Sequence, residues 1–189
     1  MPLGKRIFDL ALALAIAPFC AVALLGAVMA VKLTSRGPAL HMSPRVGREK
    51  VIFNMPKLRT MRMDTPHVAT HLLDDPANWL TPVGALLRKT SLDELPQLYS
   101  VMVGEMSFVG PRPALFNQDD LVALREEKGV NALAPGITGW AQINGRDEIS
   151  IPDKVALDEH YLRNQSLWLD IKILFMTITS VLFARGVRH

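Results

Sequence analysis

Cysteine is nearly absent from this chain, since Cys20 is the only one among its 189 residues. A single cysteine excludes an intramolecular disulfide and a zinc site built from several cysteines, and it is compatible with a reducing compartment. Aromatic residues are also few, at 6% of the chain, and the basic stretches lack the alternating aromatics of a base-stacking surface. We therefore expect no nucleic-acid partner.

Long uninterrupted elements are not expected between Pro38 and Pro152, because prolines recur there at short intervals. Residues 118–129 predict a short helix with an acidic start and a glycine stop, and residues 152–164 predict another that begins at a proline. Residues 51–54 form at best a short strand. The expected fold is α-rich, that is, α+β with little sheet.

The net charge of +3 hides an asymmetry along the chain. Residues 32–63 contain eight basic side chains and one acid, whereas residues 64–189 contain 16 acids and 11 bases. A basic block beside a membrane segment attracts anionic headgroups, and it could equally bind phosphorylated substrates or be a solvated loop.

Residues 10–31 form a run of 22 residues without a charge, enough for a helix of about 33 Å. A cleaved signal peptide and a single transmembrane helix are two interpretations. Basic residues flank the run on both sides, whereas the positive-inside rule expects them on one side of a spanning helix. A re-entrant segment that turns near Pro18, and so enters and leaves through one leaflet, satisfies both flanks.

A second apolar segment covers residues 166–184, with Asp170 and Lys172 near its start. Its Trp168 and basic ending are typical of an interfacial helix. A buried core helix is an equally good interpretation, and the two charges argue against a second span.

Asp93 and Glu94 are the first candidates for chemistry. Residues 91–94 match the S-x-x-E capping box, in which Glu94 would only bond back to the Ser91 backbone. The functional interpretation is that a carboxylate at a helix start is favoured in its ionised form, as a nucleophile or metal ligand requires.

Several cations accompany this pair. Arg112 lies between two prolines in residues 110–113, which restricts the backbone and suits a phosphate-binding arginine. Lys57 and Arg59 share one face if their segment is extended, and Arg88 directly precedes the carboxylate region. Each of them could also be an ordinary surface charge.

Residues 135–146 carry three glycines and two side-chain amides but lack the P-loop spacing. His67 and His71 are four residues apart, but no third histidine is placed to complete a metal site.

Together these segments resemble the bacterial sugar transferases known as monotopic phosphoglycosyl transferases. The resemblance runs almost from end to end, through residues 5–9, 35–38, 45–47, 57–61, 86–98, 110–113 and 135–146. It implies a re-entrant membrane helix over residues 1–34 and a compact catalytic domain with interfacial helices over residues 35–189. The domain would rest on the cytoplasmic face of the bacterial inner membrane.

The resemblance also implies a reaction. Asp93 would attack the β-phosphorus of a UDP-sugar, release UMP and form an aspartyl phosphosugar, which polyprenyl phosphate would then accept in a ping-pong mechanism. Glu94 would assist catalysis and help to place Mg²⁺. The expected substrate- and phosphate-binding residues are Arg112, Pro113, Lys57, Arg59, Arg88 and Arg146. Expected partners are the inner leaflet, polyprenyl phosphate, the nucleotide-sugar and a second copy of the chain.

Three alternatives stay open. A polyprenyl glycosyl transferase would move the sugar alone and release UDP. A membrane-anchored assembly factor would have no chemistry, and a polyprenyl diphosphate hydrolase would need no nucleotide-sugar.

Overall fold

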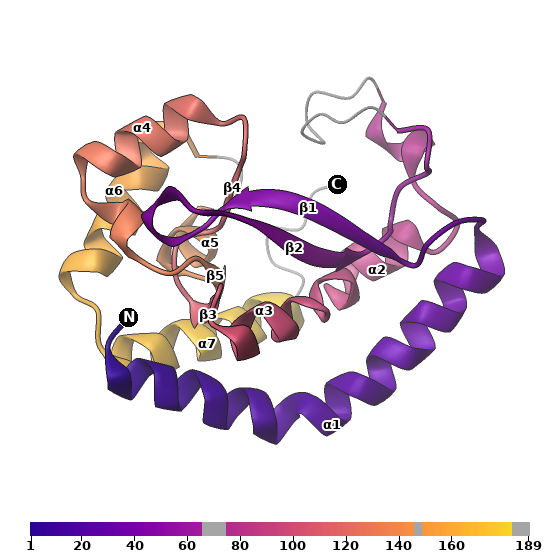
Figure 1. Ribbon diagram of the computed structural model, residues 1–189, viewed down its shortest axis with the longest axis horizontal. Helices are drawn as coiled ribbons and strands as arrows, with labels where there is room; N and C mark the ends of the chain where they lie inside the picture. The colour runs from indigo at the N-terminus through magenta and orange to yellow at the C-terminus, as the bar shows by residue number, and fades with distance from the viewer. Residues whose placement is uncertain (66–74, 146–148, 183–189) are drawn as a thin grey trace.

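The computed structural model describes residues 1–65, 75–145 and 149–182, and helices dominate it (Figure 1). In chain order the elements are α1 (Leu3–Thr34), β1 (Leu40–Val46), η1 (Arg48–Lys50), β2 (Ile52–Leu58), η3 (Pro76–Trp79), α2 (Gly84–Lys89), η4 (Leu92–Glu94), α3 (Gln97–Val103), β3 (Ser107–Val109), β4 (Ala114–Leu115), α4 (Asp119–Glu127), η5 (Val130–Ala132), β5 (Gly136–Thr138), α5 (Trp140–Asn144), α6 (Ile151–Arg163) and α7 (Leu167–Leu182). The α-rich prediction is confirmed. His67, His71 and Arg146 lie outside the described residues.

The strands are longer than the sequence predicted. β1 and β2 form an antiparallel hairpin paired from Leu40↔Leu58 to Val46↔Ile52, and β4 adds to the other side of β1. The prediction of a strand limited to residues 51–54 was wrong because prolines within β1 and β2 did not stop the pairing. Pro56 lies on an edge strand, and β4 pairs only with the end of β1 beyond Pro44. Each proline therefore has one side without a neighbouring strand, where no backbone N–H is needed for pairing.

The first helix, α1, is continuous and contains Pro18. Figure 1 shows it bending as it runs along one side of the molecule, with both ends rising toward the rest of the chain. The turn expected at Pro18 is therefore a bend within one helix rather than a break between two. Long and apolar enough to cross a membrane, α1 is a candidate membrane segment, and most of it is exposed.

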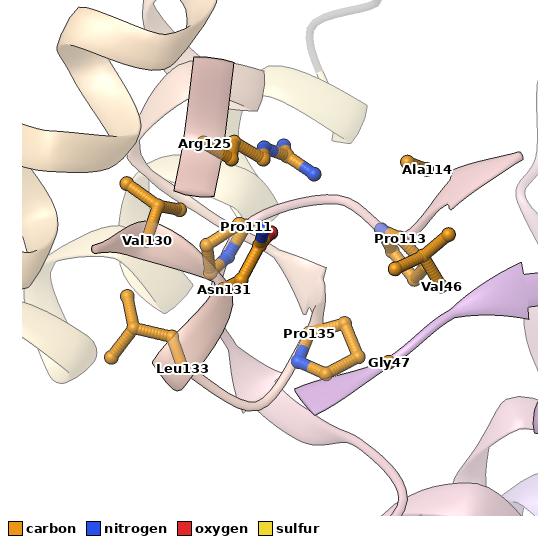
Figure 2. Close-up of a pocket in the computed structure, with 10 residues that line it drawn as sticks. All are labelled: Val46, Gly47, Pro111, Pro113, Ala114, Arg125, Val130, Asn131, Leu133 and Pro135. Carbon is orange, nitrogen blue, oxygen red and sulfur yellow. The ribbon is translucent and has the colours of Figure 1, made fainter. Parts of the chain in front are cut away.

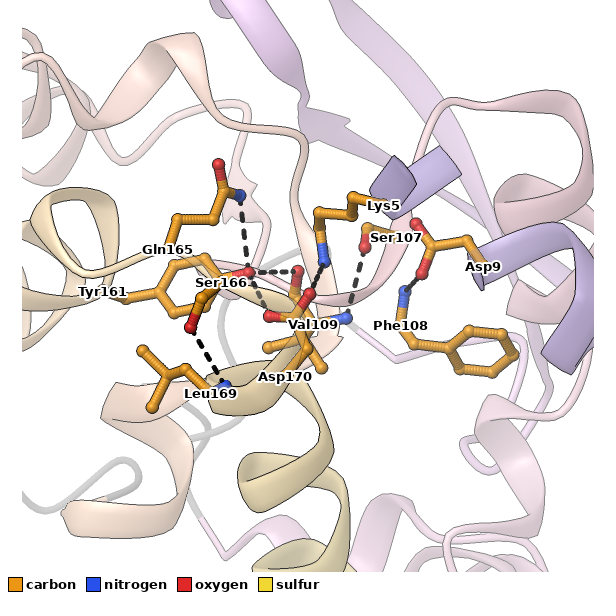
Figure 3. A network of polar contacts seen from close by, with 10 residues as sticks. All are labelled: Lys5, Asp9, Ser107, Phe108, Val109, Tyr161, Gln165, Ser166, Leu169 and Asp170. Atoms are coloured by element: carbon orange, nitrogen blue, oxygen red, sulfur yellow. Dashed lines mark hydrogen bonds and ion pairs between the residues drawn. The ribbon is translucent and has the colours of Figure 1, made fainter. Parts of the chain in front are cut away.

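The N-terminal end of α1 is bound by buried polar contacts (Figure 3). Lys5 Nζ donates to Asp170 Oδ2 of α7 over 2.7 Å, and both side chains are buried. Tyr161 Oη of α6 donates to the other oxygen of Asp170 over 2.6 Å. Asp9 Oδ1 accepts from the backbone N–H of Phe108 over 3.3 Å. The charge at Asp170 thus serves to fix α1 against α6 and α7.

The C-terminal end of α1 is held by apolar packing instead. Ala27 and Val31 are buried in a cluster with Ala39, Leu58 and Leu87, which come from the β-hairpin region and α2. Both ends of α1 therefore dock on the same domain.

The predicted helices after the hairpin are confirmed as α4, α6 and α7. α4 starts with two aspartates, and Gly129 follows it at φ +71°, a left-handed conformation that suits glycine. At the start of α6 the Ser150 hydroxyl accepts from the backbone N–H of Asp153. α7 packs in the core on one side, where Ile173 is fully buried, while Phe175 is 67% exposed, as an interfacial helix would require.

Exposed apolar side chains gather on α1, α3 and α7, which lie on one side of the molecule in Figure 1. The largest are Phe19 on α1, Tyr99 on α3, and Trp168 and Phe175 on α7. An apolar surface spread over several helices is typical of contact with a membrane or a partner.

Candidate active site

Asp93 and Glu94 lie in η4, a single 3-10 turn between α2 and α3. Ser91 precedes them at φ +56°, a left-handed conformation that is strained for a non-glycine residue. Its side chain caps no helix, and the Glu94 carboxylate does not bond back to it. The capping-box interpretation was therefore wrong, because Glu94 turns toward cations from other elements.

Two cations hold Glu94. Lys57 Nζ of β2 and the Nη2 of Arg112 both donate to Glu94 Oε1, each over 3.3 Å. Burial would raise the pKa of Glu94, but the charges of Arg112 and Lys57 outweigh it and lower that pKa to about 2. Glu94 therefore stays ionised at neutral pH. It links β2 to the loop at residues 110–113, the Arg112 loop.

Asp93 has the opposite electrostatics. Burial raises its pKa and the neighbouring charge of Glu94 adds to this, while Lys57 and Arg88 act against it. The expectation that a helix start would favour ionisation was wrong here, because a three-residue turn has no appreciable dipole. A raised pKa makes Asp93 the more basic carboxylate, and its lone pairs are correspondingly better nucleophiles.

Arg88 and Arg45 complete the cations around the pair. Arg88 Nε donates to Thr60 Oγ1 over 3.0 Å, and its charge acts on Asp93. Arg45 of β1 donates from Nε to Ser43 Oγ over 3.1 Å. Burial first, and then the charge of Arg112, lowers the pKa of Arg45 to about 10. Sequence reasoning missed Arg45 as a site residue, although it belongs to the 45–47 motif that carried the resemblance.

The loop at residues 110–113 is fixed through successive carbonyl groups. The Pro111 oxygen accepts from the backbone N–H of Gly136 over 2.9 Å, and the Arg112 oxygen accepts from Arg125 Nη1 over 2.9 Å. The Pro113 oxygen accepts from Arg45 Nη1 over 3.3 Å. The backbone beneath Arg112 is thereby set, so less conformational entropy is lost when its guanidinium binds an anion.

Close backbone approach explains Gly110 and Gly136. β3 and β5 pair in parallel, and a β-carbon at Gly110 would collide with the Ala134 carbonyl. A β-carbon at Gly136 would likewise collide with Gly110. These glycines bring the chain after β3 against β5 and so support the Arg112 loop.

Arg125 of α4 supports the same loop from a buried position. Besides the Arg112 carbonyl, it binds Asp158 Oδ2 of α6 through both Nε and Nη2, at 3.0 and 2.6 Å. Figure 2 shows Arg125 beside a cavity behind the loop, lined also by Pro111, Pro113 and others but by neither carboxylate of η4. That cavity is therefore separate from the carboxylates of η4.

The structure thus brings together Asp93, Glu94, Lys57, Arg88 and Arg112 of the residues predicted from sequence. Pro113 is buried, and its carbonyl accepts from Arg45 rather than contacting this group directly. Arg59 lies apart, since its guanidinium binds the Pro38 carbonyl and Ser35 near the end of α1.

Four cations, Arg45, Lys57, Arg88 and Arg112, surround two carboxylates. If all are charged, the surplus of two positive charges suits a diphosphate group. Within the described ranges, no group of three or more His, Cys, Asp or Glu side chains could hold a metal by itself.

Comparison with known proteins agrees with this geometry. Residues 2–184 match the bacterial sugar transferase family. The chain is 42% identical to an undecaprenyl-phosphate glucose phosphotransferase of Komagataeibacter xylinus, over 97% of this chain and 37% of that protein. It is 41% identical to EpsL, an uncharacterised sugar transferase of Bacillus subtilis, over 98% of this chain and 90% of that protein.

A third relative is a UDP-glucose:undecaprenyl-phosphate glucose-1-phosphate transferase of Caulobacter vibrioides, 40% identical over 95% of this chain and 70% of that protein. The chain thus spans well under half of the first relative and most of the other two. Since the family match extends over nearly the whole chain, this protein belongs to the bacterial sugar transferase family.

Proposed function

We propose that this protein transfers a phosphosugar from a UDP-sugar to polyprenyl phosphate. The observation that carries the proposal is a pair of unlike carboxylates. Asp93 is buried and its pKa is raised, whereas Glu94 is ionised and held by Lys57 and Arg112. The names of the relatives in Komagataeibacter and Caulobacter, which include undecaprenyl phosphate, support the same class of reaction.

In the first step an oxygen of the Asp93 carboxylate attacks the β-phosphorus of the UDP-sugar. The bond from that phosphorus to the bridging oxygen breaks, UMP leaves with the electron pair, and an aspartyl phosphosugar remains. The diphosphate is neutralised and held in line with the carboxylate by four cations, Arg112, Lys57, Arg88 and Arg45.

In the second step a phosphate oxygen of polyprenyl phosphate attacks the same phosphorus. The bond to Asp93 breaks, the carboxylate is restored and a polyprenyl diphosphosugar is released. Both acceptor and donor are anionic, so one set of cations can serve both steps.

A divalent cation fits this site. Mg²⁺ is commonly held by one or two carboxylates together with substrate phosphates, and the ionised Glu94 beside Asp93 offers such donors. When bound, the ion would neutralise charge on the transferring phosphoryl group. Lys57 and Arg112 keep the Glu94 carboxylate in place whether or not a cation is bound.

We also propose a re-entrant arrangement of α1 in the inner membrane, with the catalytic domain on the cytoplasmic face. The docking of α1 supports the re-entrant form. A helix that crossed the bilayer would carry its two ends to opposite sides. Here Lys5 and Val31, near the two ends, both pack against the domain of residues 35–182. Pro18, at the middle of α1, is then near the deepest point.

The deciding experiment identifies the nucleotide released when the protein in lipid nanodiscs meets Mg²⁺, polyprenyl phosphate and a panel of UDP-sugars. We expect UMP, with one UMP released for each acceptor molecule consumed at steady state. The UDP-sugar that supports this release identifies the sugar. Release of UDP would contradict the proposal in favour of glycosyl transfer. No nucleotide with any sugar would favour the assembly-factor alternative, or the hydrolase alternative if polyprenyl diphosphate is cleaved.

A further inference from the structure

A groove runs between α1 and the segment from η4 to α3, which lies alongside the middle of α1 (Figure 1). One wall is Ala17, Cys20 and Ala21 of α1, and the other includes Leu95, Pro96 and Tyr99. The groove has a volume of about 180 Å³ and is broadly open to its surroundings. We propose that this α1–α3 groove binds the first isoprene units of the polyprenyl phosphate acceptor, an inference that rests on the proposed function.

Small side chains at regular helical spacing create the groove. Cys20 and Ala21 lie three and four residues after Ala17, so all three share one face of α1. Larger apolar residues of the same helix, Phe19 and Val22, point away from it and are more than 70% exposed. The groove is therefore a property of one face of α1, while the other face is free for membrane lipid.

The groove also adjoins the reactive carboxylates. Leu95 and Pro96, which line it, directly follow Asp93 and Glu94 in the chain. A ligand that enters with a phosphate at one end and a branched apolar chain behind it fits a cationic site that continues into an apolar groove. The UDP-sugar has no apolar chain, so the groove serves the acceptor alone.

Cys20 allows a direct test, because it lines the groove and is the only cysteine of the chain. The unmodified protein in nanodiscs is treated with a maleimide, and the rate of Cys20 modification is measured by mass spectrometry. We expect polyprenyl phosphate to slow modification at least about fivefold, and a UDP-sugar alone to have no such effect. Equal rates with and without polyprenyl phosphate, in phospholipid of the same composition, would assign the groove to ordinary acyl chains and overturn the proposal.

A matched pair of variants gives a second readout. Ala21→Phe places a ring in the groove from an exposed position of α1, whereas Val22→Phe adds similar bulk on the outward face. We expect Ala21→Phe to raise the KM for polyprenyl phosphate about tenfold, since the loss of about two buried methylene contacts suffices. Val22→Phe should leave that KM within about twofold.

The first half-reaction separates failure of the groove from failure of the proposed function. Without acceptor, the wild type and Ala21→Phe should each release about one UMP per active site. If both do so and the acceptor KM is unchanged in Ala21→Phe, the groove assignment is wrong while phosphosugar transfer stands. If the wild type releases no UMP, with or without acceptor, the proposed function itself fails.

Discussion

At the scale of single residues, the proposed chemistry depends on two adjacent carboxylates whose pKa values shift in opposite directions. Asp93 is buried and Glu94 is partly buried. Glu94 is bonded directly to Lys57 and Arg112, whereas Asp93 has no such bond to any residue that the structure describes. Opposite shifts in a pair of acids commonly divide their roles, one as fixed charge and the other as reacting group. In the proposed mechanism this division gives attack to Asp93 and positioning to Glu94.

Asp93→Asn should lower turnover at least about a thousandfold, because the amide is a poor nucleophile of nearly the same shape. UMP release in the absence of acceptor should vanish with it. Asp119→Asn, an exposed site on α4, is the control and should keep full activity. Substantial turnover by a correctly folded Asp93→Asn protein, judged by circular dichroism, would remove Asp93 from the mechanism.

The pH profile should respond to Arg88. Asp93 must be ionised to attack, so activity falls as the pH drops through its pKa, and the charge of Arg88 lowers that pKa. Arg88→Gln should therefore move the acid limb of kcat/KM for the UDP-sugar to higher pH. Lys89→Gln, at the exposed neighbouring position, should leave the limb in place. A limb that stays put in both variants would show that Asp93 does not set it.

The buried pair behind the loop offers a stability test. Asp158→Asn leaves the Arg125 guanidinium buried without its counter-charge, which typically costs about 3–5 kcal/mol in the free energy of unfolding. The partly exposed pair of Lys128 and Glu159 is the comparison, and Lys128→Met should cost less than about 1 kcal/mol. Chemical denaturation in one detergent measures both, and similar losses would refute the distinction.

At the scale of elements, the recognisable parts were those set by local sequence. The acidic start and glycine stop of α4 and the Ser150 cap of α6 act within a few residues, so their helices could be predicted. The β-hairpin could not, because the compatibility of Pro44 and Pro56 with pairing depends on which edges the finished sheet leaves open. The roles of Lys57 and Arg59 diverge for the same reason, since residue type did not reveal their distant partners.

The attachment of α1 is likewise a property of paired elements. Lys5 and Asp170 are 165 residues apart, so no sequence pattern announces their contact. Lys5→Met should destabilise the protein by about 3–5 kcal/mol, because Asp170 is left buried with its charge uncompensated. Lys32→Met, at the exposed other end of the helix, should cost less than about 1 kcal/mol. Equal melting temperatures for Lys5→Met and wild type would show that the pair does not hold α1.

At the scale of the whole molecule, the arrangement of α1 predicts a definite topology. In a Cys20→Ser background, Pro2→Cys and Arg36→Cys place one thiol at an exposed position beyond each end of the helix. An impermeant thiol reagent should label both variants from the cytoplasmic face of membrane vesicles and neither from the other face. Labelling of the two from opposite faces would mean that α1 spans the bilayer.

The candidate site combines residues that are neighbours in the chain with residues brought together by tertiary contacts, and the first kind was the easier to predict from sequence. Asp93 and Glu94 are neighbours in the chain, so the reactive pair could be read directly. Arg45 entered the site only because β1 runs past the Arg112 loop, and its contact with Pro113 joins residues 68 positions apart. What sequence reasoning missed was therefore the part of the site built by tertiary contacts.

The apolar side formed by α1, α3 and α7 has a consequence for how rates are to be expressed. A protein held at a bilayer surface meets its lipid acceptor by lateral diffusion in two dimensions, while its nucleotide-sugar arrives from bulk solution. Diluting the acceptor with inert phospholipid, at constant moles per litre, should then slow the reaction. Under the proposed function, the acceptor constant of this protein would be a mole fraction of the membrane, and only the donor constant would be a concentration.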